Sequence, residues 1–157
     1  MGERALAACP VADRTDSAFD WYTAQWAASD VAVRGVFRKS TDALSVYDWQ
    51  YQGRDEWSTM LDTLDYLQFE VLYSISGAGV RVYFPLWLGF GPDDRASTST
   101  GALLETHSVA EFRLLRERSQ RLKAVLGRAV EAETIGPEAA RNALLSVLST
   151  RVSHRST

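Results

Sequence analysis

Apolar residues recur at changing intervals along the chain, and each interval predicts a different element. Phe19, Tyr22 and Trp26 follow Ser17 at helical spacing, which predicts an amphipathic helix beginning near residue 17. Over residues 31–51 apolar and polar positions alternate instead, apart from a polar turn near the middle. That alternation predicts an antiparallel hairpin.

The middle of the chain repeats this change of spacing. Residues 55–66 carry an apolar stripe at helical spacing, and residues 69–75 alternate as a strand does. A Gly-Ala-Gly turn leads into residues 80–89, which are apolar on both faces, as in a central strand covered by helices. Pro85 cannot donate a ladder hydrogen bond, so this strand has either a bulge or a free edge there. We expect Trp87, on the same strand, to be buried.

Two helices close the chain. Ser108 and Glu111 form a capping box, and the apolar pattern that follows reaches Gly127, a natural helix terminator. Residues 130–135 are a weak candidate for a further strand. Pro137 stands at the first turn of a last amphipathic helix, a position that suits proline.

Together these elements predict an α/β protein of the α+β kind, with a mixed five-stranded sheet packed between helices. We expect one domain over residues 15–150, because 157 residues that are 46% hydrophobic supply one sizeable core. Residues 1–14 and 151–157 show no periodicity, and we expect both to be flexible.

Charge is distributed unevenly along the chain. Residues 1–100 contain 8 Lys/Arg and 14 Asp/Glu, whereas residues 101–157 contain 9 and 6. A local basic excess on an acidic body argues against nucleic acid as the partner; it favours contact with an acidic protein surface or is simply a solvated helix face.

No apolar run is long enough for a membrane helix, and the first residues lack the core of a signal peptide. We expect a cytoplasmic monomer with no membrane partner, and the single cysteine, Cys9, fits a reducing compartment.

Residues that could carry catalysis do not converge in the sequence. His107 and His154 are the two histidines, and neither has the HExxH spacing of a zinc site. Asp93 and Asp94 are adjacent, and a turn explains them better than an acid/base pair does. Gly89-Phe90-Gly91 lacks the third glycine of a dinucleotide loop. We therefore expect no cofactor, no metal and no enzymatic activity.

The stretch VRVYFPLWLGFGPDDRASTSTGALL, residues 80–104, resembles the central strand, the turn and the start of the long helix in actin-depolymerising-factor homology domains. Arg95-Ala96 followed by Thr98 and Thr100 is most similar to the coactosin branch of that family. The predicted order of elements also matches the family's fold, which surrounds a mixed five-stranded sheet with helices.

This resemblance implies a noncatalytic protein that binds actin filaments, regulates their turnover and associates with the cytoskeleton. The run of hydroxyl residues would stand at the N-terminus of the long helix, which enters a cleft of actin in this family. Ser97 stands where coactosin-like members usually carry a lysine. The residues expected to contact actin are Arg95, Ser97, Thr98, Ser99, Thr100, Arg81, Arg113 and Arg116.

Two alternatives remain open from the sequence. A related domain could bind an actin-related complex, or another partner, without binding actin. A small α/β enzyme or ligand-binding domain could instead use a site lined by Trp49, Tyr51 and Trp57.

Overall fold

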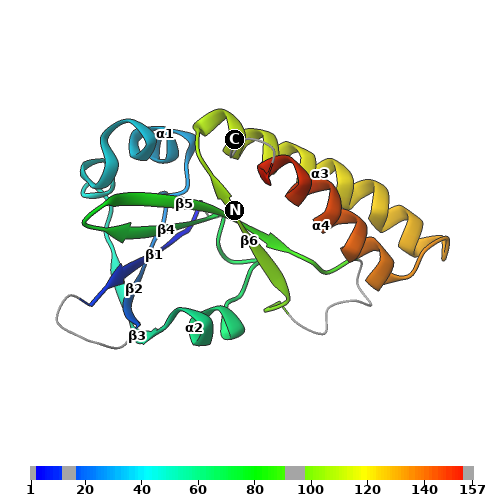
Figure 1. Cartoon of the computed structure of the whole chain (residues 1–157), viewed down its shortest axis with the longest axis horizontal. Coiled ribbons are helices and arrows are strands. Elements are labelled where there is room, and N and C mark those ends of the chain that lie inside the picture. The colour runs from blue at the N-terminus through cyan, green and yellow to red at the C-terminus, as the bar shows by residue number, and fades with distance from the viewer. Residues whose placement is uncertain (1–2, 12–16, 91–97, 154–157) are drawn as a thin grey trace.

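The computed structural model describes residues 3–11, 17–90 and 98–153 (Figure 1). Arg95 and Ser97 lie outside the described residues. The elements are, in chain order, β1 (Ala5–Pro10), β2 (Ala18–Ala24), α1 (Asp30–Lys39), the 3-10 helix η1 (Ser40–Leu44), β3 (Gln50–Glu56), α2 (Trp57–Thr63), β4 (Val71–Ser76), β5 (Gly79–Trp87), β6 (Gly101–Thr106), α3 (Val109–Glu131) and α4 (Pro137–Ser153).

Six strands form one mixed sheet in the order β3-β2-β1-β4-β5-β6. β1 and β4 are parallel, and every other neighbouring pair is antiparallel. The expected α+β class with a mixed sheet between helices is confirmed, but the sheet has six strands in the described residues rather than five.

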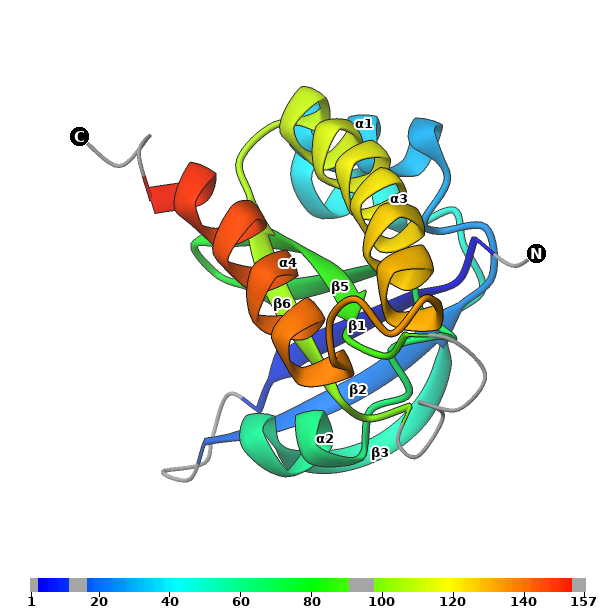
Figure 2. The ribbon, with the colours of Figure 1, turned by 90° about the vertical axis from the view of Figure 1, so that its right-hand side faces the viewer.

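Helices cover the two faces of the sheet unequally (Figure 2). One face carries the larger core, to which α1, α3 and α4 contribute buried residues such as Val33, Phe112 and Leu144. The other face carries a smaller, aromatic core around Trp21, against which residues of α2 pack. Successive side chains of β1 point to opposite faces of the sheet. Ala5 and Ala7 therefore belong to the larger core, and Leu6 and Ala8 belong to the smaller one.

The expectation that residues 1–14 are flexible is wrong for residues 5–10, which form β1 in the interior of the sheet. Ala5 to Ala8 are at most 2% exposed. Both faces of β1 are buried, so its side chains are apolar throughout and show no alternation that would mark a strand.

The expected helix from residue 17 is also wrong, because residues 18–24 form β2. Phe19 and Trp21 face the smaller core while Tyr22 and Ala24 face the larger one, so apolar residues on both sides hide the period of two. Aromatic residues fit this pleated, two-sided position well.

The expected hairpin over residues 31–51 is replaced by a helix, a 3-10 turn and the start of β3. Ser29 caps α1, since its Oγ accepts a hydrogen bond from the Ala32 amide at 3.2 Å. Val33 and Val36 are buried at helical spacing on α1, and tertiary packing thereby overrides the strand preference of valine.

The expected elements from residue 55 to residue 89 are confirmed as α2, β4 and β5. β4 pairs with β5 only as far as Leu72↔Tyr83, so Pro85 lies beyond that ladder, where no described strand pairs with this edge of β5. Trp87 is half-buried rather than buried, and the Lys123 ammonium lies 4.3 Å from its ring centroid.

The last third of the chain differs from expectation in two places. The long helix has the expected cap at Ser108 but continues past Gly127 to Glu131. Residues 130–135 therefore form the end of α3 and a turn, not a strand, and the last strand is β6, formed by residues 101–106. The terminal helix from Pro137 is confirmed; Ala140, Leu144 and Leu148 are buried on it, whereas Val147 is 46% exposed. No helix in the described ranges has the length and apolar character needed to cross a membrane.

Candidate functional site

The hydroxyl residues expected to begin the long helix instead precede β6. The Thr98 carbonyl accepts a hydrogen bond from the Tyr66 amide, and the Thr100 carbonyl accepts one from the Leu88 amide, both at 3.0 Å. Backbone contacts thus hold this segment beside the end of β5. The side chains of Thr98 and Thr100 are exposed, and that of Ser99 is half-buried.

The three described arginines expected to bind actin are all paired within the fold, and Arg81 Nε lies 3.9 Å from Glu105 Oε1. Arg113 Nη2 lies 3.4 Å and Arg116 Nη1 3.5 Å from the carboxylate of Asp30, the first residue of α1. The Arg116 guanidinium also lies 5.0 Å from the ring centroid of Phe112. These two arginines therefore help to dock α3 against α1.

Arg81 lies at the opposite end of β5 from the hydroxyl segment. Gly101 pairs with Trp87, whereas Thr106 pairs with Val82, next to Arg81. Arg81 and Trp87 are six positions apart along the strand, which is roughly 20 Å at about 3.3 Å per residue. The described members of the expected actin site thus do not form one compact cluster.

The aromatic site of the ligand-binding alternative is not assembled either. Trp49 packs against the larger core, with its Nε1 donating to the Leu44 carbonyl at 2.9 Å. Trp57 packs on the opposite face of the sheet, with its ring centroid 5.5 Å from that of Trp21. Tyr51 is exposed on β3. The three side chains therefore do not line a common site.

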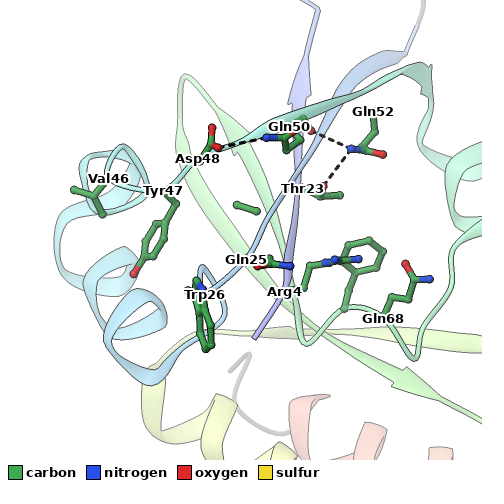
Figure 3. Close-up of a pocket in the computed structure, with 12 residues that line it drawn as sticks. Arg4, Thr23, Gln25, Trp26, Val46, Tyr47, Asp48, Gln50, Gln52 and Gln68 are labelled. Atoms are coloured by element: carbon green, nitrogen blue, oxygen red, sulfur yellow. Dashed lines mark hydrogen bonds between the residues drawn. The ribbon is translucent and has the colours of Figure 1, made fainter. Parts of the chain in front are cut away.

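The topology of the sheet instead creates a groove at one end of four strands. β1 and β4 begin at this end because they are parallel, and β2 ends there while β3 begins there because those two are antiparallel. A cavity of about 680 Å³ opens between these strand ends and the segment after η1, within the range of ligand sites. We call it the amide groove; its lining is Arg4, Thr23, Ala24, Gln25, Trp26, Val46, Tyr47, Asp48, Gln50, Gln52, Gln68 and Phe69 (Figure 3).

Trp26 stands on the rim of the amide groove in an unusual backbone conformation. Its φ is 67°, in the left-handed region that bulky residues rarely adopt, and its side chain is 63% exposed. The neighbouring Ala27 and Ala28 are fully buried, and the Ser29 amide donates to the Trp26 carbonyl at 3.2 Å. The turn between β2 and α1 thus buries two alanines and directs a large indole to the surface.

Hydrogen bonds orient part of the polar lining (Figure 3). Gln52 Nε2 donates to Thr23 Oγ1 at 3.2 Å and to the Gln50 carbonyl at 3.3 Å, and Gln50 Nε2 donates to Asp48 Oδ2 at 3.3 Å. Within the described part of the chain, the side chains of Gln25 and Gln68 have no hydrogen-bond partner. Their amides can therefore donate to and accept from a ligand.

The lining is polar, and its two formal charges cancel. It has one cation, Arg4, and one carboxylate, Asp48, among four glutamines and a threonine. Side-chain amides donate and accept hydrogen bonds without changing charge, so they suit recognition of an uncharged polar ligand. Among the described residues, no group of three or more His, Cys, Asp or Glu side chains could hold a metal ion.

Sequence reasoning missed the amide groove because its residues come from four separate segments. None of these segments has a motif, and glutamine is common on any surface. The helix expected over residues 17–26 also placed Trp26 on an inward face. Gln25 and Trp26 come directly before the two buried alanines. This pair is the sequence signal that could have indicated that the Trp26 side chain is exposed.

Comparison of the chain with protein-family models, with curated proteins and with solved structures finds no match in any of the three.

Proposed function

We propose that this protein is a noncatalytic binding domain and that the amide groove is its ligand site. The observation that carries the proposal is the exposed Trp26, held at φ 67° beside glutamine side chains with unused hydrogen-bonding capacity. Strained backbone that presents an aromatic side chain to solvent is found where proteins bind ligands. This proposal takes up the ligand-binding alternative with a different set of residues.

Binding rather than catalysis follows from the chemistry of the lining. Glutamine, threonine and tryptophan orient a ligand through hydrogen bonds and ring stacking, but they do not exchange protons near neutral pH. Asp48 is the one carboxylate of the lining, and its Oδ2 already accepts a hydrogen bond from Gln50. These residues supply affinity and orientation for a ligand.

The test is a screen of small uncharged fragments by two-dimensional amide NMR of the full chain. We expect shifts concentrated at the Trp26 indole N–H and at the side-chain amides of Gln25 and Gln68. The matched control is Trp57→Ala, which removes a half-buried tryptophan from outside the groove. Trp26→Ala should weaken fragment binding at least tenfold, while Trp57→Ala should leave it unchanged once the variant is shown to be folded. Fragments that bind only elsewhere, or equally well to Trp26→Ala, would refute the proposal.

Actin-filament binding is our second proposal, and the resemblance of residues 80–104 supports it. The order of elements no longer adds support, because residues 5–51 differ from the order that the resemblance implied and the hydroxyl residues precede β6 rather than the long helix. Exposed Thr98 and Thr100 leave the hydroxyl segment accessible to a partner. The proposed contact is therefore residues 95–100, without Arg113 and Arg116, whose side chains pair with Asp30.

Filament co-sedimentation at low and moderate salt tests this second proposal. The surface of actin is acidic, so Arg95→Glu replaces an attraction by a repulsion and should weaken binding at least tenfold. Ser97→Lys adds a positive charge and should strengthen binding. Arg81→Glu is the matched control, since Arg81 lies at the far end of β5. If neither wild type nor Ser97→Lys pellets with filaments, the actin proposal fails.

A further inference from the structure

Backbone hydrogen bonds tie together three of the segments that line the amide groove. The turn after β2 is joined to the start of β1, because the Ala28 amide donates to the Glu3 carbonyl at 3.0 Å. The segment before β4 is also joined to the start of β1, because the Glu70 amide donates to the Arg4 carbonyl at 3.0 Å. The backbone of the groove is therefore in place before a ligand arrives, which lowers the entropic cost of binding.

The side chains on these segments surround the groove with aromatic rings and amides. In Figure 3 Tyr47 and Trp26 lie at one side of the groove, Gln52 and Gln68 lie at the other, and Gln25 lies between them. Most of the Trp26 side chain is exposed, so ring surface is open to a ligand. A ligand that fills the groove thus needs an apolar face for the indole and polar groups directed to more than one side.

We propose that the amide groove binds a neutral oligosaccharide, one sugar ring of which stacks on Trp26 while its hydroxyls bond to Gln25 and Gln68. This inference rests on the proposed function and names its ligand class. A sugar ring has C–H groups on its faces, and their slight positive charge is attracted to the negative face of an indole. The cavity of about 680 Å³ suits a drug-sized ligand, and a disaccharide is of that size.

Amide side chains match sugar hydroxyls in their hydrogen bonding. A hydroxyl both donates and accepts, and the amides of Gln25 and Gln68 each offer a donor and an acceptor side by side. One amide can therefore accept from one hydroxyl and donate to its neighbour. The single cation of the lining, Arg4, is balanced by Asp48, so no excess positive charge is present to hold an acidic sugar.

Two other uncharged ligands fit the groove less well. A polypeptide strand added to β3 needs an unbroken row of backbone groups, but the register of β3 with β2 skips Gln52 at a bulge. A nucleobase presents its donors and acceptors at edges in the plane of its ring, whereas the amides of the lining lie on more than one side of the groove (Figure 3). Hydroxyls around a sugar ring can bond in several directions.

The probe is an array of neutral and acidic oligosaccharides, to which the tagged full chain is applied. The Kd of a selected oligosaccharide is then measured by isothermal titration calorimetry. We expect the selected ligands to be neutral, and their Kd should change less than twofold between low and moderate salt, because an uncharged ligand has no charge to be screened. Binding confined to acidic oligosaccharides would overturn the inference.

Substitutions of Trp26 test the stacking. Trp26→Gly removes the indole, and glycine adopts the positive φ of this position without strain, so lost binding in this variant does not come from a strained turn. It should weaken oligosaccharide binding at least tenfold. Trp26→Phe keeps an aromatic ring and should weaken binding less. Circular dichroism confirms the fold of each variant.

A double-mutant cycle tests the amide contacts. Gln68→Met removes the amide, and Gln120→Met makes the same change at an exposed position of α3 outside the groove. Each variant is titrated with analogues of the selected oligosaccharide that lack one hydroxyl. At least one missing hydroxyl should weaken binding at least tenfold for wild type and Gln120→Met but less than threefold for Gln68→Met, whose partner group is already gone. If every missing hydroxyl has the same effect on Gln68→Met as on wild type, the amide contact is wrong.

The outcomes separate this inference from the proposed function. If uncharged fragments bind the groove but no neutral oligosaccharide does, the sugar inference is overturned and the binding function stands. An oligosaccharide that binds equally well to Trp26→Gly also overturns the sugar inference, and the fragment screen then decides the binding function separately. If neither fragments nor oligosaccharides bind, both proposals fall.

Discussion

Tyr73 shows how a single buried polar group ties two elements together. Its side chain is fully buried on β4, and its hydroxyl donates to the Ala27 carbonyl at 2.7 Å. Burial also raises the pKa of this hydroxyl, so the group stays protonated and remains a donor. The bond fixes the turn that carries Trp26, since Ala27 is the next residue.

Tyr73→Phe should therefore lower the free energy of unfolding by about 1–2 kcal/mol, because it leaves a buried carbonyl without this donor. Urea denaturation followed by circular dichroism measures the change. Tyr51→Phe, which removes an exposed hydroxyl, should cost less than about 0.5 kcal/mol. Equal effects of the two substitutions would show that the Tyr73 bond does not stabilise the fold.

Glu70 predicts a pH dependence of stability. Burial raises the pKa of its carboxyl above the ordinary value of 4.5, although nearby Arg116 partly opposes the shift. A raised pKa in the folded state means that protonation favours folding, so this contribution is present below pH 4.5 and is lost as the pH rises through the folded pKa. The ionised carboxylate is therefore unfavourable in the fold at neutral pH.

Glu70→Gln should raise the free energy of unfolding at pH 7, and this gain should shrink as the pH falls through the folded pKa and be lost below 4.5. Urea titrations of both proteins across that range measure it. Glu117→Gln changes an exposed carboxylate on α3 and serves as the control. A gain for Glu70→Gln that does not vary with pH would rule out desolvation of the carboxylate as its cause.

At the scale of one element, the cap of α3 is the clearest case. Ser108 has an extended backbone, and its Oγ accepts a hydrogen bond from the Glu111 amide at 3.0 Å. Ser108→Ala should cost about 1 kcal/mol, because it leaves a helix N–H without that acceptor. Ser58→Ala, at an exposed position in α2, should cost less than about 0.5 kcal/mol. Thermal and urea unfolding compare the two, and a Ser108 effect no larger than that of Ser58 would contradict the cap's role.

At the scale of the whole molecule, β1 joins the two halves of the sheet. It pairs with β2 on one side and with β4 on the other, so the sheet is continuous only through residues 5–10. Ala7 is 2% exposed and belongs to the larger core.

Ala7→Asp should destabilise the protein by at least about 3 kcal/mol, because it buries a carboxylate without a partner. Val31→Asp is the control: Val31 is 75% exposed in the first turn of α1, where an acidic residue is favourable. Circular dichroism and urea unfolding measure both variants. A stable Ala7→Asp protein would mean that β1 is dispensable to the fold.

The sequence by itself determined the elements whose signals are local. Ser108 and Pro137 mark the starts of α3 and α4. The glycine turn between β4 and β5 can also be predicted from its own residues, without any distant contact. Hydrogen bonds and backbone limits within a few residues cause these features, so short stretches of sequence contain them.

Only the tertiary structure decided the elements that are apolar on both faces and the site built from distant segments. Residues 5–10 and 18–24 are strands because neighbouring strands and two layers of side chains enclose them, and such burial erases the alternation that marks a strand. The amide groove exists because parallel and antiparallel pairings bring Arg4, Gln25, Gln50 and Gln68 to one end of the sheet. Strand pairing over such separations depends on the packing of the whole core, which no local pattern encodes.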